Sequence, residues 1–436
     1  MGTVLFYSLP QLLPLLIFFL LMRREKLKTG LSAWLVIFLY LTYNLLVPVV
    51  DFLSFTHSFL GYTYPLSEVL QPEMTRVYAL GWCAFLAGYF LLARLRHRRM
   101  PEPENEADGR YFPVILTGIQ ILVWALIFMN YHLSGIDLLQ ILNPENREES
   151  NILFSANWAI PGLDLLSNCL PVCLYLQWRF SRKWYAGWMF LFIIWLILSL
   201  LSGWRYRIIL FFLFMVLHQL RFHTWKIQHL SLIFFAGLLI FSWLTLNRMA
   251  IAKRQFDLIT FDLSRFDMGI FTNEFSNSRT FRATLIYLKN HPESQSDGLS
   301  WFRFLGNKFK PKNSFPDRVR PKPWILEVTK AWIPLGWPWN PNPAVTQMEE
   351  FFLTFGYSGI LLGMLLLGFW TFFLDIPVQN SVIQCFKIVC MALLFQWTTR
   401  GFFLYQVQIS AVCIFPLAVL YIMKPYLPHG SARNKA

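Results

Sequence analysis

The chain has 436 residues, of which 56% are hydrophobic and only 14% are charged, with 43 Phe and 18 Trp and a mean hydropathy of +0.45. Because an ordinary soluble protein carries roughly a quarter charged residues, this composition excludes a soluble domain and predicts an integral membrane protein. The net charge of +14 does not indicate nucleic-acid binding, since the Lys and Arg residues lie mainly at the ends of apolar stretches and in one long polar loop.

Apolar stretches long enough for membrane-spanning helices follow one another along the chain. A span needs about 20 apolar residues, because lipid cannot satisfy an unpaired backbone. The first stretch is expected to be a true span rather than a cleaved signal, because its basic residues, Arg23 and Arg24, follow it instead of preceding it. Eleven spans are expected, at residues 3–22, 31–53, 77–95, 112–131, 158–178, 185–202, 206–221, 230–247, 351–373, 380–397 and 401–423.

The sequence therefore predicts an all-α, polytopic membrane protein in three parts. A bundle of eight spans covers residues 1–247, a long polar loop covers 248–350, and a bundle of three spans with a tail covers 351–436. Lys and Arg cluster in alternate short loops, at 23–28, 94–99, 179–183 and 221–226, and such loops stay in the cytoplasm. We therefore expect a multi-pass membrane protein with its N-terminus and the long loop outside, in the periplasm if the cell is Gram-negative.

Arginines on the expected external side are candidates for binding phosphate. Arg205 and Arg207 lie in a tight hairpin between two spans, and Arg400 lies in another. A guanidinium grips phosphate oxygens with two donors and keeps its charge. The alternative for each is an interfacial anchor beside Trp and Tyr. The long loop contains 15 Lys and Arg against 10 Asp and Glu, so it suits an anionic partner; its arginines include Arg248, Arg254, Arg279 and Arg282.

Three carboxylates are candidates for a general base. Glu349 and Glu350 directly precede the apolar run that opens the ninth span, and Glu274 lies within the loop. Acids in the first turn of a helix also stabilise it through the macrodipole, so a structural role is the alternative for Glu349 and Glu350. The functional hypothesis is that one carboxylate takes a proton from a sugar hydroxyl.

Aromatic residues could bind the glycan, whereas motifs for metals and cofactors are missing from the sequence. Trp204, Trp337 and Trp339 offer flat faces for sugar rings, or could seat the chain at the bilayer interface. The six Cys lie in apolar segments without a CxxC pair, which predicts buried inert thiols. The sequence contains no HExxH, GxSxG, Walker or DxD element. We therefore expect no metal and no cofactor.

Three segments carry a resemblance to a known family. They are Ser202-Gly203-Trp204-Arg205-Tyr206-Arg207, Glu349-Glu350-Phe351-Phe352-Leu353-Thr354-Phe355-Gly356-Tyr357-Ser358-Gly359, and Arg400-Gly401-Phe402-Phe403. In this order, and with one long external loop late in the chain, they resemble Wzy-type O-antigen and exopolysaccharide repeat-unit polymerases. The resemblance implies the metal-independent branch of the GT-C glycosyltransferase class. It further implies transfer of an undecaprenyl-diphosphate-linked glycan onto a second lipid-linked repeat unit at the outer face of the inner membrane.

The resemblance also implies roles and partners. Arg205, Arg207 and Arg400 correspond to the family's external arginines, which contact the diphosphate, and Glu349 or Glu350 corresponds to its acidic residue. The implied partners are lipid-linked oligosaccharide, membrane lipids and a chain-length regulator. One alternative function is an O-antigen ligase, which would depend on an external-loop histidine, here His291. Another is a polysaccharide flippase or transporter, which would favour paired broken helices and internal symmetry.

Overall fold

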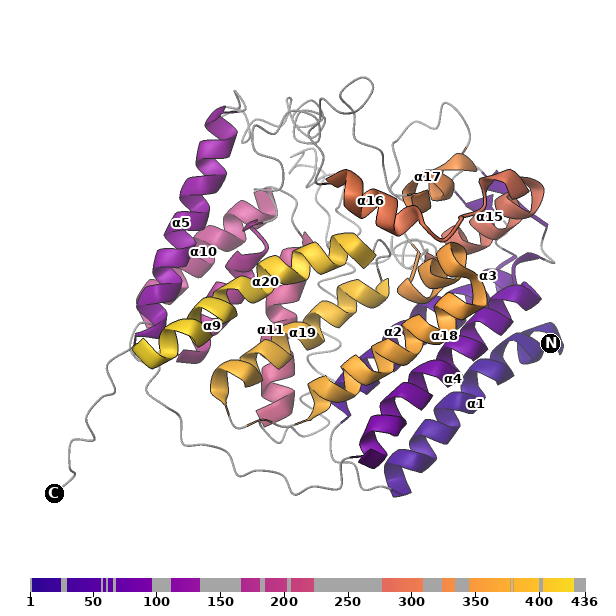
Figure 1. The fold of residues 1–436 in the computed structure, drawn as a ribbon, viewed down its shortest axis with the longest axis horizontal. Helices are drawn as coiled ribbons and strands as arrows, with labels where there is room; N and C mark the ends of the chain where they lie inside the picture. Colours follow the sequence, from indigo (N-terminus) through magenta and orange to yellow (C-terminus); the bar gives the residue numbers. More distant parts are fainter. Residues whose placement is uncertain are drawn as a thin grey trace. The chain divides into compact units, whose positions relative to one another are not determined.

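The computed structural model is helical in the parts of the chain that it describes (Figure 1). One antiparallel pair, β1 (Ser58–Phe59) and β2 (Tyr62–Thr63), is the sheet present there. The expected helical fold class is therefore confirmed, while the GT-C-like arrangement stays a prediction. The structure describes residues 2–24, 30–55, 58–59, 62–65, 68–95, 111–133, 166–180, 185–201, 205–222, 277–308, 324–333, 345–376, 378, 380–399 and 403–426.

The helices follow most of the expected apolar stretches. Six of the described helical stretches are long and apolar enough to cross a bilayer, so the structure supports a multi-pass membrane protein. They cover Leu31–Leu53, Pro72–Leu92, Phe112–Asn130, Gln347–Asp375, Ser381–Thr398 and Gln406–Met423. Thr3–Phe18 and Gly187–Leu196 are shorter apolar helices. The expected span at 230–247 lies outside the described residues, and the count of eleven stays a prediction.

The chain divides into two compact units, which we describe separately. Unit 1 contains Met1–Arg99, Thr272–Ile376 and Leu394–Val407, and unit 2 contains the rest. The helices of unit 1 are α1 (Gly2–Arg24), α2 (Leu31–Leu41), the π-helix η1 (Thr42–Leu46), α3 (Val47–Leu53), α4 (Pro72–Leu95), α15 (Asn277–Asn290), η5 (Pro292–Ser294), α16 (Ser300–Lys308), α17 (Trp324–Ala331) and α18 (Gln347–Asp375). Unit 2 contains α5 (Phe112–Leu133), α9 (Cys169–Phe180), α10 (Tyr185–Leu201), α11 (Arg205–Phe222) and η8 (Lys424–Tyr426); α19 (Ser381–Thr399) and α20 (Phe403–Met423) are divided between the units.

Three helices of unit 1 run in the same direction. The ring of Tyr7 in α1 lies 6.4 Å from that of Tyr78 in α4, and Phe18 lies 6.0 Å from Tyr89 further along both helices. Helix α18 begins beside Tyr78, whose hydroxyl donates to Glu349 at 2.6 Å. The N-terminal ends of α1, α4 and α18 therefore lie at one end of unit 1.

Helix α2 runs in the opposite direction and is fixed by a buried carboxylate. Asp375, at the C-terminal end of α18, accepts hydrogen bonds from the backbone N–H groups of Ser32 at 2.8 Å and Ala33 at 3.4 Å. It also accepts one from the Tyr89 hydroxyl at 2.9 Å. A carboxylate at a helix N-terminus satisfies donors that have no partner within the helix. The C-terminal end of the α2–η1–α3 stretch therefore lies at the same end of unit 1 as the starts of α4 and α18.

Glycine allows α4 and α18 to touch through their backbones. A Cβ added at Gly88 would overlap the carbonyl oxygen of Leu365, and one added at Gly368 would overlap that of Phe85. Small residues allow such close approach between membrane helices. We expect Gly368→Ala to lower stability by about 1–3 kcal/mol, because the backbones must separate. Thermal unfolding of the full chain in detergent measures this, with Gly118→Ala in α5 as control, since nothing lies within 4 Å of its Cβ position. Equal melting temperatures for the two variants would contradict this packing.

The described part of the expected long loop folds over the start of α18. Trp301 of α16 packs against Phe351 and Phe355, with ring centroids 5.8 and 5.1 Å apart. Trp332, which directly follows α17, donates from its indole N–H to the Thr284 hydroxyl of α15 at 3.1 Å. Figure 1 shows α15, α16 and α17 together beside this end of α18. The polar loop therefore contributes a small helical layer to unit 1.

Helix α18 is broken one third of the way along. Gly356 has φ 64° and ψ −152°, a backbone conformation that is essentially restricted to glycine. The break turns the first segment back, so that the Phe351 ring lies against Gly363. The segment 347–355 is therefore a short half-helix whose N-terminus is held among buried polar groups.

Unit 2 contains its own buried polar contacts between helices. Gln177 of α9 accepts from Gln120 at 2.9 Å and donates to Thr117 at 2.8 Å, both in α5. Tyr175 and His218 are hydrogen-bonded at 2.8 Å.

All six cysteines are free thiols, and five of them are buried as expected. Cys83 is exposed and departs from that expectation.

Candidate functional site

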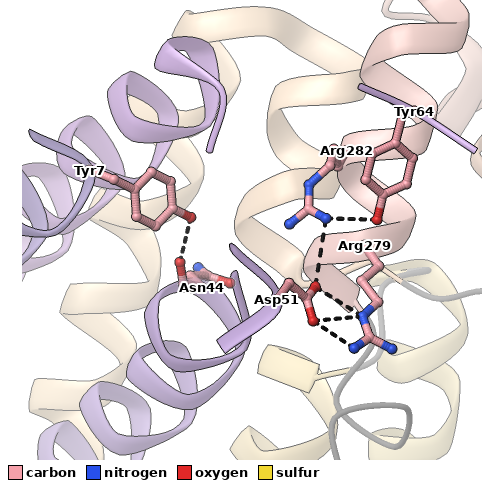
Figure 2. Close-up of polar contacts among 6 residues, drawn as sticks. All are labelled: Tyr7, Asn44, Asp51, Tyr64, Arg279 and Arg282. Atoms are coloured by element: carbon pink, nitrogen blue, oxygen red, sulfur yellow. Dashed lines mark hydrogen bonds and ion pairs between the residues drawn. The ribbon is translucent and has the colours of Figure 1, made fainter. Parts of the chain in front are cut away.

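A buried carboxylate holds two arginines of one helix. Asp51 lies in the last turn of α3, and Arg279 and Arg282 lie three residues apart on α15, which places them on one face. Arg279 donates through Nε and Nη2 to Asp51, with distances of 2.9 and 2.6 Å (Figure 2). Nη1 of Arg282 lies 3.6 Å from Oδ2 of Asp51, the same oxygen that accepts from Nε of Arg279. One carboxylate therefore serves two guanidinium groups, which leaves a net charge of +1.

Arg282 is fully buried and only partly satisfied. Its Nη1 donates to the Tyr64 hydroxyl at 2.8 Å, and its Cζ lies 5.2 Å from the centre of the Tyr64 ring. Its exposed fraction is 0%, yet Nε and Nη2 have no hydrogen-bond partner among the described residues. A buried donor without a partner costs about 1–3 kcal/mol, and a charged group costs more. This is the strongest structural sign of a ligand site in unit 1.

Tyr64 is held in place by the small β-hairpin. It directly follows β2, in which Thr63 pairs with Ser58 of β1. Burial raises the pKa of the Tyr64 hydroxyl, and the neighbouring charge of Arg282 opposes part of that rise. The hydroxyl therefore stays protonated at neutral pH and accepts the Arg282 hydrogen bond as a neutral group.

Glu349 caps the half-helix that starts α18. Its Oε2 accepts the backbone N–H of Thr346 at 2.6 Å, and the Thr346 hydroxyl accepts the N–H of Glu349 at 3.4 Å, which is a capping box. Its Oε1 accepts the Tyr78 hydroxyl at 2.6 Å. One oxygen therefore caps the start of α18, and the other accepts a hydrogen bond that joins α18 to α4.

Glu350 lies beside it and is also buried. Its exposed fraction is 1%, and its backbone N–H donates to the Thr346 carbonyl at 2.9 Å. The capping contacts of the helix use Thr346 and Glu349, so the Glu350 carboxylate is not part of the capping box. Of the two adjacent acids, Glu349 is thus the one whose carboxylate forms the capping box, and the Glu350 carboxylate lies outside it.

Aromatic and amide groups connect the arginines to the start of α18. The Tyr78 ring lies 6.0 Å from that of Phe281, which is next to Arg282, and the Tyr78 hydroxyl donates to Glu349 at 2.6 Å. Tyr7 donates to the Asn44 carbonyl at 2.7 Å, as Figure 2 shows. Asn44 belongs to η1, and π-helical turns often occur at functional sites. The two clusters therefore lie at one end of unit 1.

The structure describes only some of the residues predicted from the sequence. Arg282, Glu349 and Glu350 lie together in unit 1. Arg207 lies in unit 2, where it is buried and its Nε donates to Asn168 at 2.9 Å. The prediction that hairpin arginines and loop share one pocket stays untested. The following lie outside what the structure describes: Arg248, Arg400, Glu274, Trp204, Trp337, Trp339 and the side chain of Arg205.

Three residues of the site were not predicted from the sequence, whereas Arg279 was expected only as one of the positive charges of the loop. Asp51 had a signal, because an ionisable residue inside an apolar span is by default a functional candidate. Tyr64 and Tyr78 had none, since a tyrosine near a span end is common at membrane interfaces.

Two further observations bear on the chemistry. His291, the histidine expected for a ligase, stacks on Tyr287 at 4.4 Å and is hydrogen-bonded to the exposed Glu293 at 3.1 Å. It is thus an exposed residue after the end of α15. Within the described part of the chain, no group of three or more His, Cys, Asp or Glu could hold a metal ion.

Comparisons of this chain with protein-family models, with curated proteins and with solved structures found no match.

Proposed function

We propose that the protein is a metal-independent glycosyltransferase of the GT-C type that polymerises undecaprenyl-diphosphate-linked repeat units into an O-antigen or exopolysaccharide. The observation that supports this most is Arg282, a buried arginine with two unpartnered donors, near an acidic half-helix. A diphosphate needs cationic donors, and an attacking sugar hydroxyl needs a carboxylate. Unit 1 contains both kinds of group at one end.

The proposed reaction transfers the growing glycan as a block. The acceptor hydroxyl oxygen forms a bond to the anomeric carbon of the donor while the bond from that carbon to the diphosphate oxygen breaks. The diphosphate leaves with the electron pair, and Arg282 stabilises its charge, a contact worth about 3 kcal/mol in comparable sites. Glu350 takes the hydroxyl proton. Glu349 holds the half-helix in place, because both of its oxygens already accept hydrogen bonds.

The expected orientation places these groups outside. Helix α1 ends at Arg24, within the basic stretch 23–28, and its N-terminal half lies beside the site through the contact of Tyr7 with Tyr78. Basic loops stay in the cytoplasm, so the opposite end of unit 1 faces outwards. Lipid-linked repeat units are polymerised on that face in the family that the sequence resembles.

Deleting the gene in its own cell distinguishes this proposal from its alternatives. Loss of a polymerase leaves surface glycan only one repeat unit long. Loss of a ligase leaves long polymer on the lipid carrier, and loss of a transporter leaves single repeat units facing the cytoplasm. Either of the last two outcomes would contradict the proposed polymerase function and support the ligase or the transporter instead. The single broken helix α18 is the one described feature that a transporter would share.

A further inference from the structure

The Nε–Nη2 edge of the guanidinium group has a partner in Arg279 but none among the described residues in Arg282. Arg279 binds Asp51 through Nε and Nη2, so a carboxylate occupies that edge. Arg282 makes its contacts to Tyr64 and Asp51 through Nη1, which lies on the other side of the group. The Nε–Nη2 edge of Arg282 has no partner among the described residues.

The surroundings of this edge are polar. Ser278 lies one helical turn before Arg282 on α15, and its hydroxyl is also buried without a partner among the described residues. Tyr7 of α1 is also buried, and its hydroxyl donates to the Asn44 carbonyl at 2.7 Å. An apolar side chain would leave these donors unpaired, whereas an oxygen anion would satisfy them. The geometry of Arg279 with Asp51 shows how such an anion fits.

We infer that the Nε–Nη2 edge of Arg282 is a binding site for one phosphate oxyanion, which it grips with two parallel hydrogen bonds. Asp51 is the positioning residue for this edge. Its carboxylate pairs with Nη1 of Arg282, so the Nε–Nη2 edge faces away from Asp51. Arg279 is a structural residue, since its own edge is filled. The inference rests on the proposed function only in naming a polyprenyl diphosphate as the lipid that bears the phosphate. A free phosphate or pyrophosphate presents the same kind of oxyanion.

Anion binding to the purified full-length protein tests this site. The protein is placed in nanodiscs of neutral phosphatidylcholine and titrated with pyrophosphate by calorimetry. In a second arm the nanodiscs contain undecaprenyl phosphate, and its retention is measured by native mass spectrometry. Binding in both arms is expected, and the arm with the tighter binding identifies the source of the phosphate.

Variants then assign the binding to this edge. Arg282→Gln should weaken binding roughly 10- to 100-fold, because charge-assisted hydrogen bonds are lost. Arg282→Lys keeps the charge but not the two-donor edge, so its affinity should fall between those of wild type and Arg282→Gln. Arg303→Gln is the matched control, because Arg303 is an exposed arginine of α16 paired with Asp297 at 2.6 Å, and its affinity should equal that of wild type.

Any of three results would overturn the inference. The first is equal binding by wild type, Arg282→Lys and Arg282→Gln, and the second is no binding by wild type in either arm. The third is a cryo-electron microscopy map at saturating pyrophosphate that shows only water at this edge. Its failure and that of the proposed function are separable, because binding without polymerisation would leave the anion site standing, and polymerisation without binding here would place the diphosphate elsewhere.

Discussion

Replacing Asp51 by Ala should destabilise the protein by about 3–5 kcal/mol, because removal of one partner leaves buried charges uncompensated. Asp51 is 1% exposed, and it pairs with Arg279 and Arg282, which are themselves buried. The cost is large because both guanidinium groups are buried and Asp51 supplies the carboxylate that pairs with them. Unfolding of the full chain in bicelles, followed while denaturing detergent is added, measures it.

The control for Asp51→Ala is an ion pair of the same kind at the surface. Asp297 and Arg303 are paired at 2.6 Å, but their side chains are 46% and 68% exposed. Such a pair contributes about 0–1 kcal/mol, so Asp297→Ala should change stability little. If both Asp variants unfold at the same detergent concentration, the buried charge network does not stabilise unit 1 as described.

The second prediction separates two neighbouring carboxylates. Glu350→Gln should lower the rate at which the glycan is extended by about 10²–10⁴-fold, the usual contribution of a general base, while the protein stays folded. Glu349→Gln should instead lower stability by about 0.5–2 kcal/mol, because it weakens the cap of α18. Rates of chain extension and melting temperatures of both variants, measured on the same preparations, test this.

The neighbouring residue is itself the control here, because Glu349 and Glu350 share position, burial and charge. Their contacts differ: Glu349 accepts from Tyr78 and Thr346, and Glu350 lies outside the capping box. Loss of extension in Glu349→Gln with an unchanged melting temperature would assign the base to Glu349 instead. Normal extension by Glu350→Gln would remove Glu350 from the mechanism.

Helix positions could be predicted from the sequence because apolar runs of about 20 residues have a single solution in lipid. Helices α2 to α3, α4, α18, α19 and α20 all lie where such runs occur. The long loop was harder to predict, since α15, α16 and α17 are short and polar and owe their position to packing against α18 and against one another.

The site could be predicted only where local sequence carries a signal. Glu349 and Glu350 stand out at the start of an apolar run, and the structure does place them at a buried helix start. The partnership of Asp51 with Arg279 joins residues 228 positions apart, which no local pattern reveals. Likewise, that Glu349 is a capping residue depends on Tyr78, 271 positions away.

Reconstitution of polymer synthesis tests the central claim most directly. Purified protein in liposomes is supplied with lipid-linked repeat units, and the products are separated on a gel. Wild type and Arg303→Gln should give a ladder of lengths spaced by one repeat unit, and Arg282→Gln should give single units only. A ladder of normal length from Arg282→Gln, or no ladder from wild type, would contradict the proposed glycan polymerisation at this buried site.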